Sequence, residues 1–406
     1  MSKFVDFSVT DFGCEIYEKY SIIKILRNPE KIEKKREKQL KELLGIYVHI
    51  PFCVRKCKYC DFLSGPAGKD TQKAYVEKLL EEIEQNRELL AERKTETIFF
   101  GGGTPSAIDA VDIARILDTL KLYGNVSEDA EISIEANPGT VTEDKLKIWK
   151  QAGVNRISFG LQSADNEELK TLGRIHTWEE FVENYHLART CGFTNLNVDL
   201  MSALPGQSVD SWRKTVERVL ALEPEHISAY SLIIEEGTPF FEAYGNHPEL
   251  LPTEEEERSI YYETKSMLAA KGYERYEISN YAKPGYECRH NISYWERVDY
   301  LGLGLGAASL LGTERKSNQT SLEEYLKGNF EGEREVLSQT NAIEEYFFLG
   351  LRKMKGVDWM PYKEQYRETV DKLVEKGLLE QKGSMIKLTE LGIDVSNYVL
   401  AEFLVD

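Results

Sequence analysis

Six short runs of apolar and β-branched residues recur between residues 46 and 232, and longer segments with helical periodicity separate them. Because a parallel return between strands needs a long crossover, repeated strand–helix units predict an α/β fold with a parallel sheet. Six units suit an open doubly wound sheet or a partial barrel. The runs are Ile46–Ile50, Thr97–Phe100, Glu131–Glu135, Arg156–Phe159, Asn195–Leu200 and His226–Leu232, and the helical patterns between them include Ala74–Leu90 and Thr142–Ala152.

The rest of the chain divides by pattern. We expect an N-terminal extension over residues 1–45, the strand–helix region over 46–240, a less regular region over 241–340 and a C-terminal domain over 341–406. The C-terminal domain looks helical and then carries a strand pair around Leu378–Leu388, an order that predicts a winged-helix-like module. In the extension, Lys24–Leu44 suits a solvated helix after Pro29, and a docking patch for an acidic partner or a membrane surface is the alternative.

Charge and cysteine usage narrow the class of protein. Acidic residues outnumber basic ones 69 to 51, for a net charge of −18, which excludes a broadly basic nucleic-acid binder. The N-terminus lacks a continuous apolar signal core, so we expect a cytoplasmic protein. A disulfide framework would spread its partners along the chain. Three of the six cysteines instead lie within eight residues, which indicates a metal or redox site; the six are Cys14, Cys53, Cys57, Cys60, Cys191 and Cys288.

The cysteine triplet is the central motif. Its spacing, Cys-x-x-x-Cys-x-x-Cys at Cys53, Cys57 and Cys60, lets one loop wrap three thiolates around one side of a metal centre. On zinc, three ligands leave one position for His49 or water. On a 4Fe-4S cluster, they leave one iron without a cysteine. Structural zinc sites more often use two Cys-x-x-Cys pairs, and the sequence has no second pair, so the spacing favours the cluster.

With an aromatic residue, Tyr59, before its last cysteine, the triplet resembles the signature of the radical S-adenosylmethionine (SAM) superfamily. The resemblance implies a partial (β/α)6 TIM-type barrel. It also implies a 4Fe-4S cluster on Cys53, Cys57 and Cys60, whose open iron chelates the amino and carboxylate groups of SAM before reductive cleavage of that cofactor.

Barrels of this type gather their chemistry at the carboxyl ends of the strands. Polar and glycine residues follow the predicted strands in order, whereas any one of them alone carries little weight. The resemblance implies that they form one SAM pocket together with the two tyrosines of the cysteine motif: Tyr47, Tyr59, Gly102, Gly103, Thr104, Glu135, Gln162, Arg174, Asp199 and Ile233.

The likeness extends from about Ile46 to the C-terminus. The segments YVHIPFC, GGGTPS, EANPG, GVNRISFGLQS, LGR and DLMSALPGQ resemble the oxygen-independent coproporphyrinogen III oxidase family. The decarboxylating oxidases of that family carry a further cysteine two residues after the triplet, where this chain has Phe62. The Asp61-Phe62 form is similar to the haem-chaperone branch, although the 45-residue extension is more familiar in the oxidase branch.

A second motif, from Cys288 to Trp295 (CRHNISYW), supports the haem-chaperone branch, which carries His-Asn-x-x-Tyr-Trp in association with haem binding. An imidazole can ligate haem iron, a guanidinium can pair with a propionate, and aromatic rings can pack on the macrocycle. Cys288 is a competing thiolate ligand. The alternative is that these residues only pack where the barrel closes. The haem candidates are His290, Arg289, Tyr294 and Trp295.

Three functions remain to be separated. The first is a radical SAM haem chaperone that delivers haem to acceptor proteins, with flavodoxin or ferredoxin as the electron donor. The second is oxidative decarboxylation of coproporphyrinogen III. The third is a zinc-stabilised binding module. The sequence leaves open the oligomeric state, the haem acceptor and whether the chain acts as an enzyme.

Overall fold

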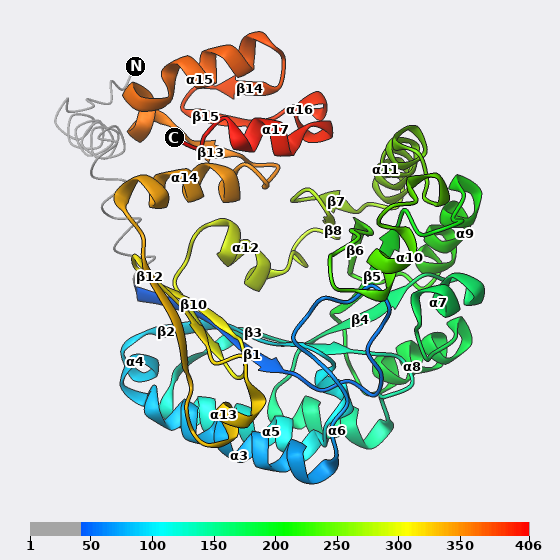
Figure 1. Cartoon of the computed structure of the whole chain (residues 1–406), viewed down its shortest axis with the longest axis vertical. Coiled ribbons are helices and arrows are strands. Elements are labelled where there is room, and N and C mark those ends of the chain that lie inside the picture. Colours follow the sequence, from blue (N-terminus) through cyan, green and yellow to red (C-terminus); the bar gives the residue numbers. More distant parts are fainter. Residues whose placement is uncertain (1–41, 406) are drawn as a thin grey trace, which may run out of the picture.

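A computed structural model describes residues 42–405 of the chain (Figure 1). Within them, one twelve-stranded sheet has the order β12-β11-β10-β9-β1-β2-β3-β4-β5-β6-β8-β7, and β9 and β1 to β6 run parallel. The strands are β1 (Leu43–Ile50), β2 (Lys94–Gly102), β3 (Asn125–Ala136), β4 (Arg156–Gln162), β5 (Leu196–Ser202), β6 (His226–Ser231), β7 (Glu274–Arg275), β8 (Asn280–Ala282), β9 (Tyr300–Leu303), β10 (Ala308–Leu311), β11 (Glu314–Asn318) and β12 (Glu331–Val336).

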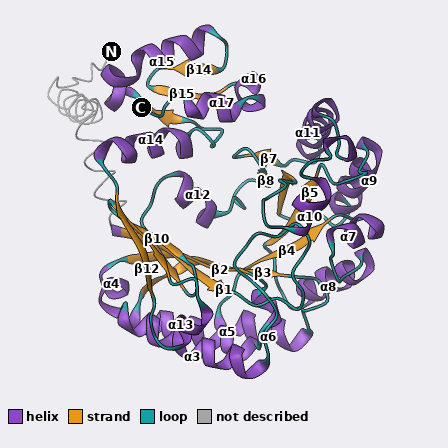
Figure 2. Cartoon of the chain, in the orientation of Figure 1, coloured by secondary structure: helices purple, strands orange, loops and turns teal. Residues whose placement is uncertain are grey.

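Helices cover the outer face of this curved sheet (Figures 1 and 2). The predicted partial barrel with a parallel sheet is confirmed. Seven helices follow β1 to β5 on that face: α3 (Lys69–Gln85), α4 (Arg87–Glu92), α5 (Ala110–Tyr123), α6 (Glu143–Ala152), α7 (Asn166–Leu172), α8 (Trp178–Thr190) and α9 (Val209–Leu220). Later in the chain come α10 (Pro239–Tyr244), α11 (Glu254–Ala269), α12 (Arg289–Trp295) and α13 (Leu322–Leu326), with short 3-10 turns at Pro105–Ala107 and Pro248–Leu250.

The alternation of side chains along the strands makes the barrel apolar outside and polar inside. In β3, Ile132 and Ile134 join the hydrophobic core under the helices, whereas Glu131, Ser133 and Glu135 point the other way, into the lumen. A polar lumen gives ligands hydrogen-bonding partners along its length. It also explains why these strands do not have the continuously apolar sequence of a strand buried on both faces.

Segment ends differ from the sequence predictions in two places. The helical pattern over Ala74–Leu90 is interrupted at Asn86, which caps the end of α3 and the start of α4. Leu43 and Leu44, predicted to end a helix of the extension, instead begin β1 beside Lys94 and Thr95. The rest of that predicted extension helix, and the docking patch weighed for it, lie outside the described residues.

The glycine-rich run that begins at Leu301 forms strands as well as a turn. Its first residues belong to β9, which pairs in parallel with β1, and its last to β10, which returns antiparallel to β9. At the turn, Gly304 has a φ of +98°, and a Cβ there would lie 2.5 Å from the hydroxyl of Tyr75. Glycine therefore lets the turn pack directly against α3.

Helix α12 lies between the two edges of the parallel region (Figure 1). Before it, β8 pairs antiparallel with β6, and after it, β9 pairs with β1. The segment that carries the candidate haem motif therefore spans the open side of the barrel.

The C-terminal part has a hydrophobic core of its own, which includes Phe347, Trp359, Val370 and Phe403. Its three-stranded sheet has the order β13-β15-β14. Helices precede the β14–β15 hairpin, which is the order expected of a winged-helix-like module. The assignment of this part to that class of module stays a prediction. Its elements are α14 (Gln339–Gly350), β13 (Val357–Asp358), a 3-10 turn (Met360–Tyr362), α15 (Lys363–Glu375), β14 (Leu379–Lys382), β15 (Met385–Leu388), α16 (Glu390–Asp394) and α17 (Ser396–Ala401). No helix within residues 42–405 is long and apolar enough to cross a bilayer.

Candidate functional site

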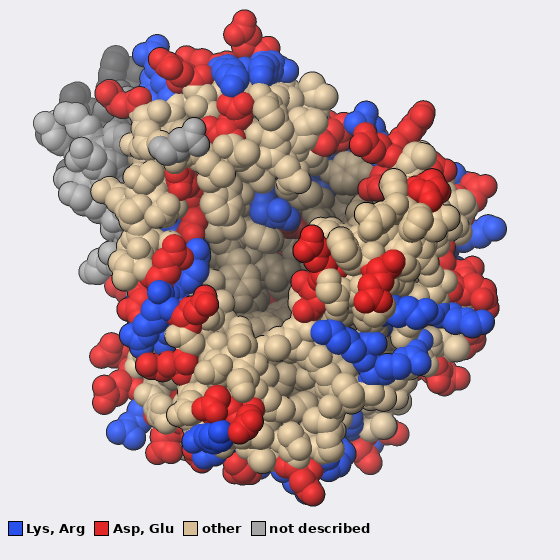
Figure 3. Space-filling view, viewed as in Figure 1, with Lys and Arg blue, Asp and Glu red and all other residues tan. Residues whose placement is uncertain are grey.

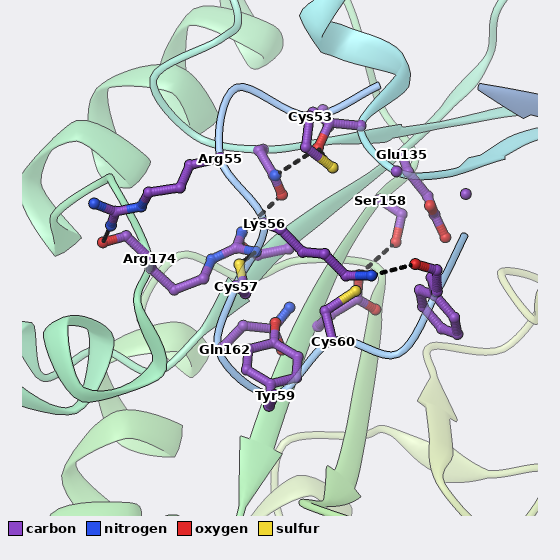
Figure 4. A pocket seen from close by; sticks show the side chains of 18 of the residues that line it. Cys53, Arg55, Lys56, Cys57, Tyr59, Cys60, Glu135, Ser158, Gln162 and Arg174 are labelled. Carbon is purple, nitrogen blue, oxygen red and sulfur yellow. Dashed lines mark hydrogen bonds between the residues drawn. The ribbon is translucent and has the colours of Figure 1, made fainter. Parts of the chain in front are cut away.

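A pocket opens at the carboxyl ends of the parallel strands, and the loop of residues 51–68, here called the cysteine loop, forms one wall (Figure 4). Sequence-predicted residues of four strands, β2 to β5, meet there with the cysteines of that loop. The pocket is lined by Cys53, Cys57, Tyr59, Cys60, Gly102, Gly103, Thr104, Glu135, Gln162, Arg174 and Asp199, and also by Arg55, Lys56, Phe62, Ala136, Asn137, Ser158, Gly160 and Tyr230.

The three cysteines of the loop are free and half-buried. The Sγ of Cys53 accepts a hydrogen bond from the Thr104 hydroxyl at 3.4 Å, and the Sγ of Cys57 accepts one from the Arg174 guanidinium at 3.5 Å. Burial raises the pKa of the Cys60 thiol. Within the described residues, no three Cys, His, Asp or Glu side chains converge closely enough to hold a single metal ion. Three thiolates on one cluster need no such convergence, because each ligates a different iron.

Backbone hydrogen bonds join the segment Gly101–Thr104 at the end of β2, here called the glycine loop, to the cysteine loop. The N–H of Gly103 donates to the carbonyl of Ile50 at 2.9 Å, and that of Thr104 donates to Phe52 at 2.8 Å. A Cβ on Gly103 would lie 3.0 Å from the Sγ of Cys53, and a Cβ on Gly102, which has a φ of +110°, would lie 2.5 Å from the His49 ring. Both positions need glycine for close approach, so the backbone itself lines the pocket.

Arg174 connects the cysteine loop to two strands. Besides Cys57, its guanidinium donates to the carbonyl of Gly160 and, at 2.7 Å, to Oδ1 of Asn137. Its Nε is buried and has no hydrogen-bond partner among the described residues. A buried donor without a partner is costly, so the pocket has a polar position that a ligand can satisfy.

Two carboxyl groups, those of Glu135 and Asp199, line the pocket. Asp199 accepts hydrogen bonds from the Ser158 hydroxyl at 2.9 Å and from the Asn197 amide at 2.7 Å, and burial raises its pKa. Burial, together with the nearby charge of Asp199, raises the pKa of Glu135 to about 8. Glu135 therefore carries a proton near neutral pH, and a protonated carboxyl can both donate to and accept from hydroxyl groups.

Gln162 has a positive φ of 75° at the end of β4, a conformation that is costly for a side chain other than glycine. Its Oε1 accepts a hydrogen bond from the Tyr230 hydroxyl at 3.1 Å. This tyrosine, together with Ser158 and Asn137, was missed by the sequence analysis. Ser158 on β4 and Tyr230 on β6 belong to the alternate residues whose side chains point into the barrel. This period-two alternation was the sequence signal that could have identified both.

Two of the predicted cofactor residues do not line the pocket. Ile233 is 69% exposed and lies beyond the end of β6. The hydroxyl of Tyr47 is 3.1 Å from Nδ1 of His49, and its ring stacks on Phe99. Ile233 was expected in the pocket because it follows the end of a strand in the sequence. In the structure, the segment after Ser231 leaves its side chain exposed.

The four haem candidates lie on α12, away from the cysteine loop. Both ring nitrogens of His290 have partners: Nδ1 lies 2.9 Å from the Thr97 hydroxyl, and Nε2 lies 2.9 Å from that of Tyr294. Burial and the charge of Arg156 lower the pKa of His290 to about 3, so the ring is neutral.

Arg289 and Trp295 of the haem motif also contact neighbouring residues, although the buried Nε1 of Trp295 has no hydrogen-bond partner among the described residues. The side chain of Arg289 donates to the carbonyl of Asp129 at 2.7 Å, and the guanidinium of Arg352 stacks on Trp295 at 4.5 Å from the ring centroid. Burial raises the pKa of Cys288 to about 12. Cys288 is therefore a thiol, which makes it a poor competitor for haem iron.

Two family models match the chain. The Radical SAM superfamily model matches residues 47–219, and the HemN C-terminal domain model matches residues 337–395. The first range covers β1 to α9, which includes the cysteine loop and the pocket residues up to Asp199. The second covers most of the C-terminal part with its separate core.

The curated relatives include the haem chaperone HemW of Lactococcus lactis, which is 36% identical over 89% of this chain and 97% of that protein. HemW of Escherichia coli is 36% identical over 89% of this chain and 98% of its own length. Among solved structures, coproporphyrinogen III oxidase (HemN) from Escherichia coli, described as a radical SAM enzyme, superposes with a TM-score of 0.78 at 25% identity and covers 93% of this chain and 94% of that chain.

Proposed function

The chain belongs to the HemW family of radical SAM proteins, and on that premise we propose that it binds haem and delivers it to haem-requiring acceptor proteins. The observation that carries this proposal is the match to HemW, at 36% identity over 97% of the Lactococcus lactis protein. The match includes both the barrel and the C-terminal domain, so the proposal concerns the whole molecule.

In this proposal, Cys53, Cys57 and Cys60 hold a 4Fe-4S cluster. The donor set fits such a cluster, since it consists of three free thiols on one loop, facing a pocket. Hydrogen bonds to thiolates tune a cluster, and here Thr104 and Arg174 donate to two of the three sulfurs. When bound, the cluster and SAM supply reductive cleavage of the sulfonium.

The remaining pocket groups bind and orient SAM. Backbone groups of Gly102 and Gly103 are accessible at the glycine loop, and the orphaned Nε of Arg174 offers a donor. The protonated carboxyl of Glu135 and the carboxyl of Asp199 suit the two hydroxyl groups of a ribose, because one can donate while the other accepts. Thr104, Tyr59 and Gln162 complete the proposed SAM contacts. Tyr47 and Ile233 lie outside the lining of the pocket.

For haem, we propose contact through α12. The ring of His290 is neutral and therefore competent to ligate iron, provided that Tyr294 releases Nε2. Arg289, the first residue of the same helix, is half-exposed, and it can exchange its bond to Asp129 for a propionate. Tyr294 and Trp295 supply aromatic surface for the macrocycle.

The residue at position 62 favours delivery of haem over decarboxylation of its precursor. The oxidases that this chain resembles have a cysteine there, whereas Phe62 lines the pocket with a side chain that is 63% exposed and cannot ligate iron. An anaerobic assay with coproporphyrinogen III, SAM and a reductant tests the point. Formation of protoporphyrinogen IX would contradict a purely chaperone role.

We propose that a small acidic electron carrier such as flavodoxin or ferredoxin reduces the cluster in the cytoplasm. Arg55, Lys56 and Lys58 are exposed on the cysteine loop of a chain whose net charge is −18. This local basic surface at the mouth of the pocket suits an acidic partner, because complementary charge steers encounter.

The test of the proposed function is a haem titration of the anaerobically reconstituted protein, followed by mixing with an apo form of a haem protein. We expect wild type to bind haem and to transfer it, and His290→Ala to lose both activities. Failure of the wild type to bind or transfer haem would overturn the proposal. Exposed Glu128→Gln, on β3, serves as the matched control.

A further inference from the structure

Arg156, the first residue of β4, is a buried cation that nothing nearby neutralises directly. Its side chain points into the barrel, and the residue is 2% exposed. Its Nε is buried without a partner, and among residues 42–405 the guanidinium takes part in no hydrogen bond and no ion pair. A guanidinium keeps its charge at every working pH and presents five donors, so this arrangement is costly unless something else occupies the site.

The nearby carboxylates do not serve as its partners. Glu131 accepts hydrogen bonds from the backbone N–H groups of Arg289 and His290, at 3.0 and 3.1 Å, and from the thiol of Cys288. Asp199, as described above, accepts from Ser158 and Asn197. Both carboxylates therefore act on Arg156 only through space, and its donors remain available.

A second orphan lies beside Arg156. Ser133 is its register partner on β3, so the two side chains leave neighbouring strands on the same face of the sheet. Ser133 is fully buried, and its hydroxyl has no hydrogen-bond partner among the described residues. Two adjacent buried groups that lack partners form a polar position prepared for a ligand atom.

Arg156 lies between the two proposed ligand sites. The groups that act on it electrostatically are Cys288 and Glu131 beside α12, Tyr276, and Asp199 in the proposed SAM pocket. Its own charge contributes to the lowered pKa values of His226 on β6 and of His290 on α12. Figure 3 shows a hollow at the centre of this face of the molecule, with mostly uncharged walls and charged side chains at its rim.

We propose that Arg156 and Ser133 form an anion subsite inside the barrel that binds a carboxylate of the ligand held between the SAM pocket and α12. A carboxylate matches the planar fork of a guanidinium with two parallel hydrogen bonds, and the serine hydroxyl can donate a third. Under the function proposed above, on which the identity of the ligand rests, that carboxylate is a haem propionate.

The test compares haem with haem dimethyl ester, which lacks the propionate charges, in the full-length protein. Because hydrogen bonds to a charged group are strong, we expect wild type to prefer haem by about tenfold or more and Arg156→Met to lose most of that preference. Arg115→Met removes an exposed arginine on α5 that pairs with Glu77, and it should keep the preference. An unchanged preference in Arg156→Met would overturn the subsite.

Circular dichroism shows whether Arg156→Met folds. Ser133→Ala is a second variant that tests the subsite even if Arg156→Met does not fold. We expect Ser133→Ala to reduce the preference for haem over its dimethyl ester severalfold, because it removes one hydrogen bond to a charged group. An unchanged preference in Ser133→Ala would contradict the subsite. If wild type binds neither porphyrin, the proposed function fails on its own. The subsite is then tested with propionate, which should raise the melting temperature of wild type more than that of Arg156→Met, and equal shifts would overturn it.

Discussion

The hydroxyl oxygen of Tyr294 lies 2.9 Å from Nε2 of His290, so one residue of the candidate haem motif holds the nitrogen that another would offer to iron. The opposite nitrogen, Nδ1, is held by Thr97. This pairing fixes the ring on α12 and keeps it buried at 1% exposure. Haem can reach Nε2 only after the tyrosine hydroxyl moves away, which makes this hydrogen bond a cost of haem binding.

Tyr294→Phe keeps the aromatic ring and removes that competing hydroxyl. A hydrogen bond of this kind contributes about 1 kcal/mol, so we expect the variant to bind haem about fivefold more tightly than wild type. The measurement is a titration followed in the Soret band. His290→Ala is the companion variant and should lose the tight site, and equal haem affinity in all three proteins would show that His290 is not the ligand.

Cys57→Ala is expected to abolish the visible absorption of the reconstituted cluster and the reductive cleavage of SAM. The reason is that a cluster held by three thiolates cannot lose one without losing its attachment. Iron, sulfide and zinc are measured on the same anaerobic samples. Cys191→Ala is a matched control because this free, half-buried cysteine caps the end of α8, and it should retain both signals. Zinc without iron in the wild type would contradict the cluster.

Gly102→Ala should impair SAM binding and lower the free energy of unfolding by about 2 kcal/mol, the scale of a strained backbone conformation. The added methyl would meet the ring of His49, and the φ of +110° suits only glycine. Binding of SAM is measured by equilibrium dialysis and stability by urea unfolding. Gly65→Ala, in the cysteine loop, has open space around the added atom and should behave like wild type. Equal loss in both variants would point to a general sensitivity of this region.

Glu135 predicts a pH dependence of stability. Its pKa is raised to about 8, so between pH 4.5 and 8 the folded chain keeps a proton that the unfolded chain has lost. Its contribution to the free energy of unfolding therefore falls as the pH rises through this window, by at most about 1.4 kcal/mol per pH unit. Above pH 8 both states are ionised and the dependence ends.

Glu135→Gln has no ionisable group at this position. Its free energy of unfolding relative to that of wild type should therefore increase from pH 5 to pH 8 and then level off. Urea unfolding at a series of pH values measures the difference. Glu128→Gln, exposed on the same strand, should run parallel to wild type. A constant difference between Glu135→Gln and wild type across the window would show that Glu135 is ionised in the folded protein.

Local pattern was enough to predict the six central strands and most of the pocket. Residues such as Gln162 and Asp199 lie where they do because parallel strands bring their carboxyl ends to one edge. The pairing of β9 with β1 could not be predicted from local pattern, since that contact joins residues about 250 apart in the chain. Tertiary contact, rather than local preference, decides such a pairing.

Side-chain partners were the other part that pattern could not supply. Glu82 fits the charged face of an amphipathic helix, yet it is 3% exposed and accepts hydrogen bonds from Tyr325, Asn318 and the backbone of Gly304. Likewise, the motif at His290 indicated a metal ligand but could not reveal that Thr97 and Tyr294 already hold both nitrogens. Such pairings depend on the packed geometry.

Helix α12 is tethered at both ends, through β8 to β6 and through β9 to β1. A cargo that pushes this helix aside therefore pulls on the first and the sixth strands together, and β1 leads straight into the loop that carries the three thiols. The helix proposed to contact haem and the loop proposed to hold the cluster are thus joined through a single continuous sheet.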